Sequence, residues 1–194
     1  VAEGAIALPQ GTVLAAQHIA LAAALGQTQV HVRRPLRVAL FSTGNEVTEP
    51  GKNRPPAGIY DSNRALLRAL CTRPGLQVTD LGILPDNRAA IAKALMAAKG
   101  HDVVLTSGGV SLGEEDHVKA AVEEIGVLNF WRMAIKPGRP VALGAIGDAA
   151  FVGLPGNPVA VFVTFAAIVR PLLAALAGAH VNLPLPLPVE AGFA

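Results

Sequence analysis

The residues best suited to chemistry lie in two glycine-rich turns. The first turn, residues 106–116, reads TSGGVSLGEED, and the second, residues 154–158, reads LPGNP. Each turn follows a short apolar run and precedes a helical pattern, an arrangement in which backbone N–H groups face an anion. Because three acids end the first turn, a hard cation could lie beside that anion. The two turns therefore predict phosphate and metal chemistry.

The glycines of these turns would allow a backbone to approach a ligand closely. A tight strand-to-helix turn that binds nothing is the alternative interpretation. The candidate binding residues are Ser107, Gly108, Gly109, Val110, Ser111 and Gly113 in the first turn and Pro155, Gly156, Asn157 and Pro158 in the second.

Two acids from separate parts of the chain are candidate metal ligands and catalytic residues. Asp116, next to Glu115, ends the first turn, and Asp61 opens a helix after a long loop. Helix capping and compensation of the helix dipole explain acids at such positions equally well. Together they would suit Mg²⁺, which is usually held by one or two carboxylates and substrate phosphates. We predict Asp61, Glu115 and Asp116 as the metal ligands.

A basic turn and a polar strand end add further candidates. Lys136 and Arg139 flank a Pro-Gly pair, either as exposed charges or as cations that position an oxyanion. The polar group after the first buried strand is Thr43, Gly44, Asn45 and Glu46.

Composition excludes several classes of protein. The chain has 194 residues, of which 52% are hydrophobic and 15% charged, so a large core is easily supplied. A net charge of +2 with scattered basic residues argues against nucleic-acid binding. The single cysteine, Cys71, cannot form an internal disulfide and fits a reducing compartment, which predicts a cytoplasmic protein. The dispersed histidines suggest no zinc site.

No secretory signal is visible, and no membrane span is expected. The most apolar stretch, residues 159–169, is shorter than the ~20 residues that a bilayer requires. We therefore predict a buried helix there. The start at Val1 and the unfinished end indicate a fragment of a longer protein.

From residue 37 onward, predicted strands and helices alternate along the chain. The expected strands are residues 38–41, 78–81, 103–106, 127–133, 141–143 and 150–152. The expected helices of this part are residues 62–70, 87–99, 116–125 and 158–177. This alternation predicts an α/β fold, a three-layer α/β/α domain with a mostly parallel sheet. Ligands of such sheets bind beyond the carboxyl ends of the strands.

The segments before and after this pattern look different. Residues 3–13 could form a strand and turn, residues 17–25 a helix that Gly26 ends, and residues 29–32 a short strand. We expect residues 1–35 to be the end of a preceding domain or a linker, and residues 36–178 to be the α/β domain. Residues 179–194 would be a linker and the start of a truncated C-terminal β domain.

Five motifs together resemble a known family, the molybdopterin molybdenumtransferases, called MoeA in bacteria. The family includes the E domains of gephyrin and of its plant counterpart. The motifs, in the family's order, are STGNE at 42–46, DSN at 61–63, SGGVSLGEED at 107–116, KPGRP at 136–140 and LPGNP at 154–158. The resemblance covers roughly residues 17–178 and implies that the α/β domain binds molybdopterin on a MoaB/Mog-like fold.

The resemblance also implies an activity. Family members insert molybdenum from molybdate into adenylylated molybdopterin and release AMP, with the support of Mg²⁺, and they act as homodimers. Asp61 and Asp116 match the family's essential acids, and Pro155 and Pro158 match its proline loop. Lys136 matches the basic turn. The chain departs from the family at Arg139, where lysine is usual, and at Ala160, where many members have serine.

Other functions on the same fold stay open at this point. A molybdopterin adenylyltransferase or a CinA-like nucleotide hydrolase would share the Ser-Gly-Gly turn. The motifs at 61–63 and 136–138 favour the transferase. A non-catalytic scaffold domain, as gephyrin partly is, is a further alternative, although the polar site residues are all present.

Overall fold

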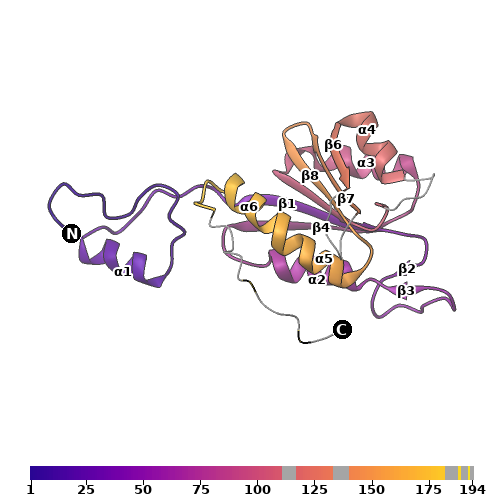
Figure 1. The fold of residues 1–194 in the computed structure, drawn as a ribbon, viewed down its shortest axis with the longest axis horizontal. Coiled ribbons are helices and arrows are strands. Elements are labelled where there is room, and N and C mark those ends of the chain that lie inside the picture. The colour runs from indigo at the N-terminus through magenta and orange to yellow at the C-terminus, as the bar shows by residue number, and fades with distance from the viewer. Residues whose placement is uncertain (111–116, 133–139, 182–187, 189–191, 193–194) are drawn as a thin grey trace. The chain divides into compact units, whose positions relative to one another are not determined.

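The computed structural model describes residues 1–110, 117–132, 140–181, 188 and 192. The chain divides into two compact units. One unit combines Val1–Arg33 with Pro171–Ala194, and the other is Arg34–Arg170. The second unit holds the sheet and the candidate site (Figure 1).

The described part of the Arg34–Arg170 unit contains a sheet with the strand order β4-β1-β5-β8-β7-β6. Its strands are β1 (Leu36–Thr43), β4 (Leu76–Leu84), β5 (Val103–Ser107), β6 (Val127–Arg132), β7 (Pro140–Ile146) and β8 (Ala149–Leu154). The first four strands in the sheet order are parallel, whereas β7 pairs antiparallel with both β8 and β6. The predicted mostly parallel sheet is confirmed.

Helices cover both faces of this sheet (Figure 1). The helices α3 (Arg88–Ala97) and α4 (His117–Ile125) pack on one face, and α2 (Ser62–Cys71) and α5 (Pro158–Thr164) pack on the other. A short 3-10 turn, Ala98–Gly100, follows α3, and a π-helical turn, Phe165–Val169, joins α5 to α6 (Arg170–Leu176). The three-layer α/β/α architecture is therefore confirmed.

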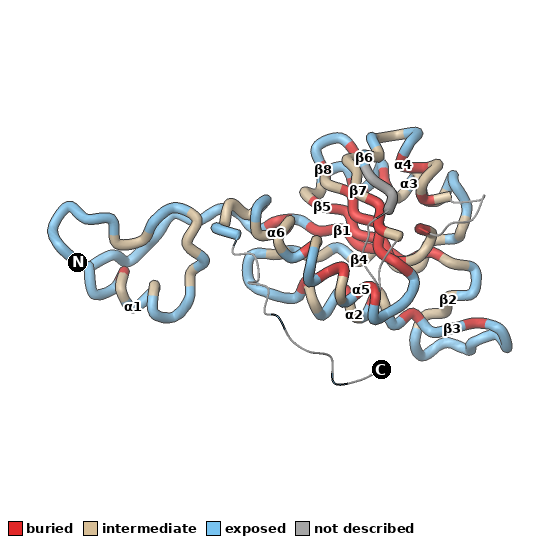
Figure 2. Tube along the Cα trace, viewed as in Figure 1, coloured by how far each residue is buried: buried red, intermediate tan, exposed pale blue. Residues whose placement is uncertain are grey.

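The central strands carry the core. Val38, Ala39, Leu40 and Phe41 of β1 are all fully buried, as the continuous apolar run predicts for a strand covered on both faces. Figure 2 shows this burial along the middle of the sheet. Cys71 is also fully buried, and this burial raises the pKa of its thiol to about 11. Cys71 therefore contributes to packing and is a poor nucleophile at neutral pH.

Three helix starts have side-chain caps. Asp61 accepts a hydrogen bond from the backbone N–H of Arg64 and caps α2, and Asn87 caps α3 in the same way. Asn157 caps α5 by accepting from two backbone N–H groups, and Pro158 occupies the first turn of the helix. The capped starts of α3 and α5 directly follow the carboxyl ends of β4 and β8.

Three local predictions differ from the structure. The predicted long loop contains a pair of short parallel strands, β2 (Val47–Thr48) and β3 (Ile59–Tyr60). The predicted strand in residues 3–13 and the one at residues 29–32 are wrong: in the stretch before β1 the structure has the helix α1 (Ala16–Ala24) and no strand. Neither segment has a neighbouring strand there to supply the hydrogen bonds of a ladder.

The predicted buried helix is buried on one face only. Pro158–Leu176 forms a continuous helical stretch of 19 residues with a mean hydropathy of 2.2, long and apolar enough to cross a membrane by length and composition alone. Core helices often meet the same two criteria. Val161 and Phe165 are buried, whereas Val159 and Phe162 are 62% and 52% exposed. The apolar composition of the run did not indicate which face of the helix would be buried against the rest of the protein.

A polar clamp joins the starts of β1 and β5. Asp102 accepts two hydrogen bonds from the guanidinium of Arg34, at 2.6 and 2.7 Å, and one from the backbone N–H of Arg37 at 2.7 Å. The hydrogen bonds from Arg34, opposed by partial burial, hold the pKa of Asp102 at about 2. A carboxyl group with a depressed pKa stabilises the folded state above its unfolded pKa, and this contribution disappears as the pH falls through the folded pKa.

Replacing Asp102 with asparagine is therefore expected to lower the free energy of unfolding at pH 7. The loss should be under about 1 kcal/mol, because the Arg34 side of the clamp is exposed and screened by solvent. The variant should also lose part of the wild-type decline in stability between pH 4 and pH 2. Urea denaturation of both proteins across this range measures the effect, and identical pH dependence would contradict it.

Candidate functional site

The candidate site is a pocket at the carboxyl edge of the parallel strands. Its walls come from the ends of β1 and β5, the β2–β3 loop, the start of α2 and the second glycine turn. The lining residues are Ser42, Thr43, Glu46, Val47, Ile59, Tyr60, Asp61, Ser62, Asn63, Ser107, Gly108, Gly156 and Pro158. Four of the five motifs that the sequence analysis singled out contribute to it, so segments far apart in the chain converge as the parallel sheet predicts.

The structure brings together only part of the predicted set. The predicted residues that line the pocket are Thr43, Glu46, Asp61, Ser107, Gly108, Gly156 and Pro158. Those that the structure describes elsewhere are Gly44, Asn45, Gly109, Val110, Pro155 and Asn157. Those that lie outside the described residues are Ser111, Gly113, Glu115, Asp116, Lys136 and Arg139.

The predicted residues outside the pocket lining have structural contacts. Val110 is buried in the core beside α4. The carbonyl of Pro155 accepts a hydrogen bond from the Ser107 hydroxyl at 3.3 Å. The side chain of Asn45 accepts from the backbone N–H of Asp86 at 3.4 Å. These residues support the edge of the sheet.

The di-glycine turn is needed for close packing. Gly108 and Gly109 have φ of +85° and +66°, in the left-handed region. A Cβ on Gly108 would lie 2.5 Å from the carbonyl oxygen of Thr43, and one on Gly109 would lie 2.5 Å from a methyl carbon of Val118. The glycines therefore let the ends of β1 and β5 approach each other. Gly108 also lines the pocket, so packing and ligand access share this turn.

Asp61 is the most constrained acid of the pocket. It is 4% exposed, and its carboxylate accepts the Ser42 hydroxyl, the Arg64 backbone N–H at 3.0 Å and the Arg64 Nε–H at 3.0 Å. A carboxylate has about four lone-pair sites, so most of its accepting capacity is used. Within the described ranges, no group of three or more His, Cys, Asp or Glu side chains could hold a metal ion.

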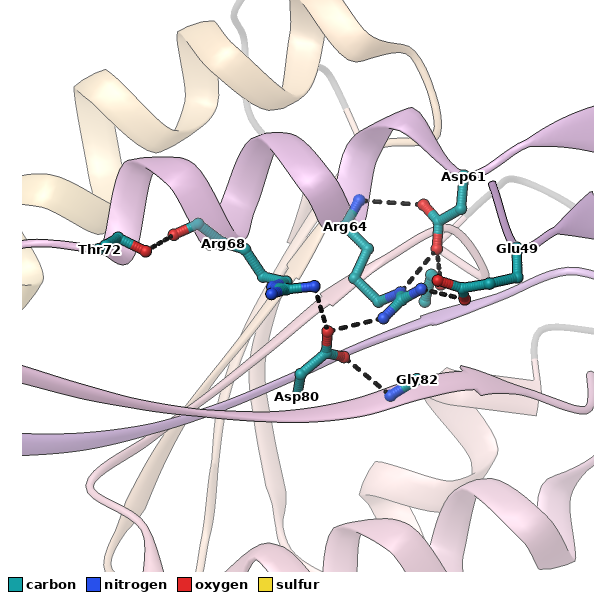
Figure 3. Close-up of polar contacts among 8 residues, drawn as sticks. Glu49, Asp61, Arg64, Arg68, Thr72, Asp80 and Gly82 are labelled. Carbon is teal, nitrogen blue, oxygen red and sulfur yellow. Dashed lines mark hydrogen bonds and ion pairs between the residues drawn. The ribbon is translucent and has the colours of Figure 1, made fainter. Parts of the chain in front are cut away.

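Arg64 is the residue that the sequence analysis missed. Its side chain is 8% exposed and lies among three carboxylates: Asp61, Asp80 at 2.7 Å and Glu49 (Figure 3). Burial opposes its charge, but the hydrogen bonds that Arg64 donates to the three acids outweigh burial and raise the pKa of Arg64. The one sequence feature that could have pointed to Arg64 is its position directly after the DSN motif. An arginine in the first turn of a helix does not by itself indicate a functional role.

Asn63 was noted only as part of a motif. Its Nδ2 donates to the carbonyl of Gly156 at 2.7 Å, which joins the start of α2 to the second glycine turn. Its Oδ1 is buried and has no hydrogen-bond partner among the described residues. A buried acceptor without a donor is uncommon in folded proteins. Asn63 lines the pocket, so this unsatisfied acceptor belongs to the site.

The sheet order and the pocket at its carboxyl edge define a class of protein. A family model described as a probable molybdopterin binding domain matches residues 39–175, and the chain belongs to that family. The resemblance that the five motifs indicate is thereby confirmed at the level of the family.

Particular relatives sharpen this assignment. The chain is 47% identical over 179 residues to a molybdopterin molybdenumtransferase of Haemophilus influenzae, an alignment that covers 92% of this chain and 44% of the relative. It is 37% identical over 176 residues to the protein of the same name in Nostoc sp., with 88% and 40% covered. The chain thus spans less than half the length of these two curated relatives.

Solved structures agree with the family. A molybdopterin biosynthesis MoeA protein of Pyrococcus horikosii superposes with a TM-score of 0.78 at 32% identity, covering 89% of this chain and 43% of that one. The biosynthesis enzyme MoaB of Thermus superposes with a TM-score of 0.56 at 20% identity, over 74% of this chain and 96% of that one. The second likeness shows the shared fold alone.

Proposed function

We propose that the protein carrying this chain is a molybdopterin molybdenumtransferase, which inserts molybdenum from molybdate into adenylylated molybdopterin and releases AMP. The observation that supports this most is the convergence of four family motifs on one pocket, in a chain 47% identical to a relative of that name. A role in molybdenum cofactor biosynthesis follows from the family. The specific reaction, a cytoplasmic location and a homodimer are part of the proposal.

The pocket suits a ligand that carries both phosphate and hydrogen-bond donors. Ser62 and Asn63 lie in the first turn of α2, whose N-terminus favours negative charge. Ser107 and Gly108 line the same pocket. The free Oδ1 of Asn63 would accept an N–H or O–H group of the pterin or the nucleotide. Lys136 and Arg139 would position molybdate, because both are cations and molybdate is an oxyanion.

In this proposal, Asp116 and Glu115 are better candidates than Asp61 for binding Mg²⁺. Three hydrogen bonds and the charge of Arg64 already engage the Asp61 carboxylate, so a cation would have to compete with them. Asp61 as a metal ligand stays a prediction. When bound, Mg²⁺ would neutralise phosphate charge.

The test of the function is AMP release from adenylylated molybdopterin, with and without molybdate and Mg²⁺. Molybdate-dependent release would establish the transferase. Release that does not respond to molybdate, or none, would overturn it. ATP-dependent adenylylation of molybdopterin would instead assign the adenylyltransferase activity, the alternative that the Ser-Gly-Gly turn at 107–109 leaves open.

Replacing Asp116 with asparagine is expected to abolish AMP release and to leave the unfolding temperature unchanged. The loss should be at least about 100-fold in the rate, because Asp116 would hold the Mg²⁺ that neutralises phosphoryl charge, and removing electrostatic stabilisation of this kind has effects of that size. The matched control is Glu123→Gln, which neutralises an exposed acid of the following helix. Single-turnover AMP release by Asp116→Asn at the wild-type rate would contradict the role of Asp116.

A further inference from the structure

Arg64 is the charged centre of a cluster that no motif predicts. We define the Arg64 cluster as Glu49, Asp61, Arg64 and Asp80. Arg64 donates from Nε to Asp61 at 3.0 Å, from one terminal nitrogen to Asp80 at 2.7 Å and from the other to Glu49 (Figure 3). All three guanidinium nitrogens are therefore used, and each reaches a different acid.

The three acids belong to three different parts of the fold. Asp61 caps α2, Asp80 lies within β4, and Glu49 directly follows β2 in the loop of residues 44–60. One buried guanidinium thus connects a helix, the sheet and a loop. Asp80 is itself held by the backbone N–H of Gly82 at 2.9 Å, which anchors the cluster to the sheet.

The loop of residues 44–60 has hydrogen bonds and a ring contact of its own. The N–H of Ile59 donates to Glu46 and that of Asp61 donates to Thr48, at 2.8 and 2.9 Å. The guanidinium of Arg54 lies 5.8 Å from the ring centre of Tyr60. These contacts join the loop to itself and to the helix start. The ion pair between Glu49 and Arg64 connects the middle of the loop to β4 through Asp80, in addition to the hydrogen bond from the Asp86 N–H to Asn45 near the start of the loop.

The same loop forms one wall of the pocket. Glu46 and Val47 from one arm, and Ile59 and Tyr60 from the other, all line it. Asp61 follows directly, and its carboxylate direction is set by Ser42 and Arg64. Movement of Arg64 would therefore change the wall and the pocket carboxylate together.

We propose that Arg64 is the positioning residue of this pocket: it orients the Asp61 carboxylate and, through Glu49, holds the loop of residues 44–60 in place. The inference rests on the proposed function for the identity of the ligand, adenylylated molybdopterin. An arginine suits this task because its planar fork holds several acceptors in fixed directions, which a lysine ammonium does not do.

The test removes the loop contact and leaves the rest of the cluster intact. Glu49→Ala deletes a side chain that is 40% exposed, so the variant should fold. Glu49→Gln keeps an oxygen that can accept from Arg64 and serves as the conservative rescue. The matched control is Arg68→Gln, because Arg68 is 59% exposed and contacts Asp80 at 3.4 Å but neither Glu49 nor Asp61.

Two readouts separate positioning from general stability. Amide hydrogen exchange of Ile59 and Asp61 should become at least about tenfold faster in Glu49→Ala, because the loop opens locally, while exchange in α3 stays unchanged. The dissociation constant of adenylylated molybdopterin should rise about 10–100-fold, by analogy with the loss seen when residues that orient metal ligands are removed. Glu49→Gln should recover much of both, and Arg68→Gln should match the wild type.

The outcomes distinguish this inference from the proposed function. Unchanged loop exchange in Glu49→Ala, or faster loop exchange with unchanged binding, would overturn the positioning role of Arg64. Equal changes in loop exchange and binding in Arg68→Gln would overturn it as well. Arg68 contacts Asp80 but not Glu49, so such a result would mean that disturbing Asp80 alone causes the changes. A wild-type protein that binds no adenylylated molybdopterin would overturn the proposed function, and loop exchange would still report whether Glu49 holds the loop.

Discussion

Replacing Arg64 with methionine is expected to lower the free energy of unfolding by about 3–5 kcal/mol at pH 7, the cost of leaving buried charges without their partner. Methionine nearly preserves the side-chain volume, so lost packing contributes little. The affected acids are Asp61, which is 4% exposed, and Asp80, whose side chain is 22% exposed. Glu49 is more exposed and would be solvated by water.

The pH dependence of the free energy of unfolding provides a second, independent test of this prediction. Burial alone would raise the pKa of Asp80, but hydrogen bonds from Arg64 and from the Gly82 backbone hold it below its usual value. In the wild type, Asp80 therefore contributes stability that is lost as the pH falls through its lowered pKa. Without Arg64, burial dominates and protonation of Asp80 becomes favourable, so the stability deficit of the variant should shrink as the pH falls from 6 towards 3.

Chemical denaturation of Arg64→Met at several pH values measures both effects. Arg68→Met is the control, since its exposed ion pair with Asp80 should contribute under about 1 kcal/mol. A loss for Arg64→Met no larger than that of the control would contradict the view that Arg64 is the partner of the buried acids. A deficit that grows with acidification would contradict the assignment to Asp80.

Replacing Gly108 with alanine is expected to destabilise the fold by about 2–4 kcal/mol, through positive φ and a backbone clash together. The φ of +85° is unfavourable for any residue with a Cβ, and the added carbon would lie 2.5 Å from the carbonyl oxygen of Thr43. Backbone atoms at the ends of two paired strands have little room to move. Pocket binding should weaken in the same variant, because both residues line the pocket.

Gly147 provides a matched control for the backbone term. It has φ of +59°, yet nothing lies within 4 Å of a Cβ built on it. Gly147→Ala should therefore carry only the conformational penalty, about 1 kcal/mol. Thermal and urea unfolding of the two variants give the comparison, and equal losses would show that close packing at Gly108 contributes nothing beyond its φ.

Much of the fold was predictable because its signals are local. The apolar run of β1, the caps Asn87 and Asn157 and the proline at the start of α5 each act within a few residues of themselves. The position of the candidate site followed from the same signals, since parallel strands bring their carboxyl ends to one edge. The exposed face of the Pro158–Leu176 helix was not predictable, because an apolar composition does not say which side finds a neighbour.

By itself, the sequence determined the alternation of strands and helices, the helix starts and the family to which the chain belongs, because these depend on short motifs and local periodicity. Only the tertiary structure decided what the site residues contact. Arg64 meets Asp80 across 16 positions of chain, and Asn63 meets Gly156 across 93. Such pairs form because strands and helices distant in the chain pack together, and no local pattern records which side chains then share a buried space.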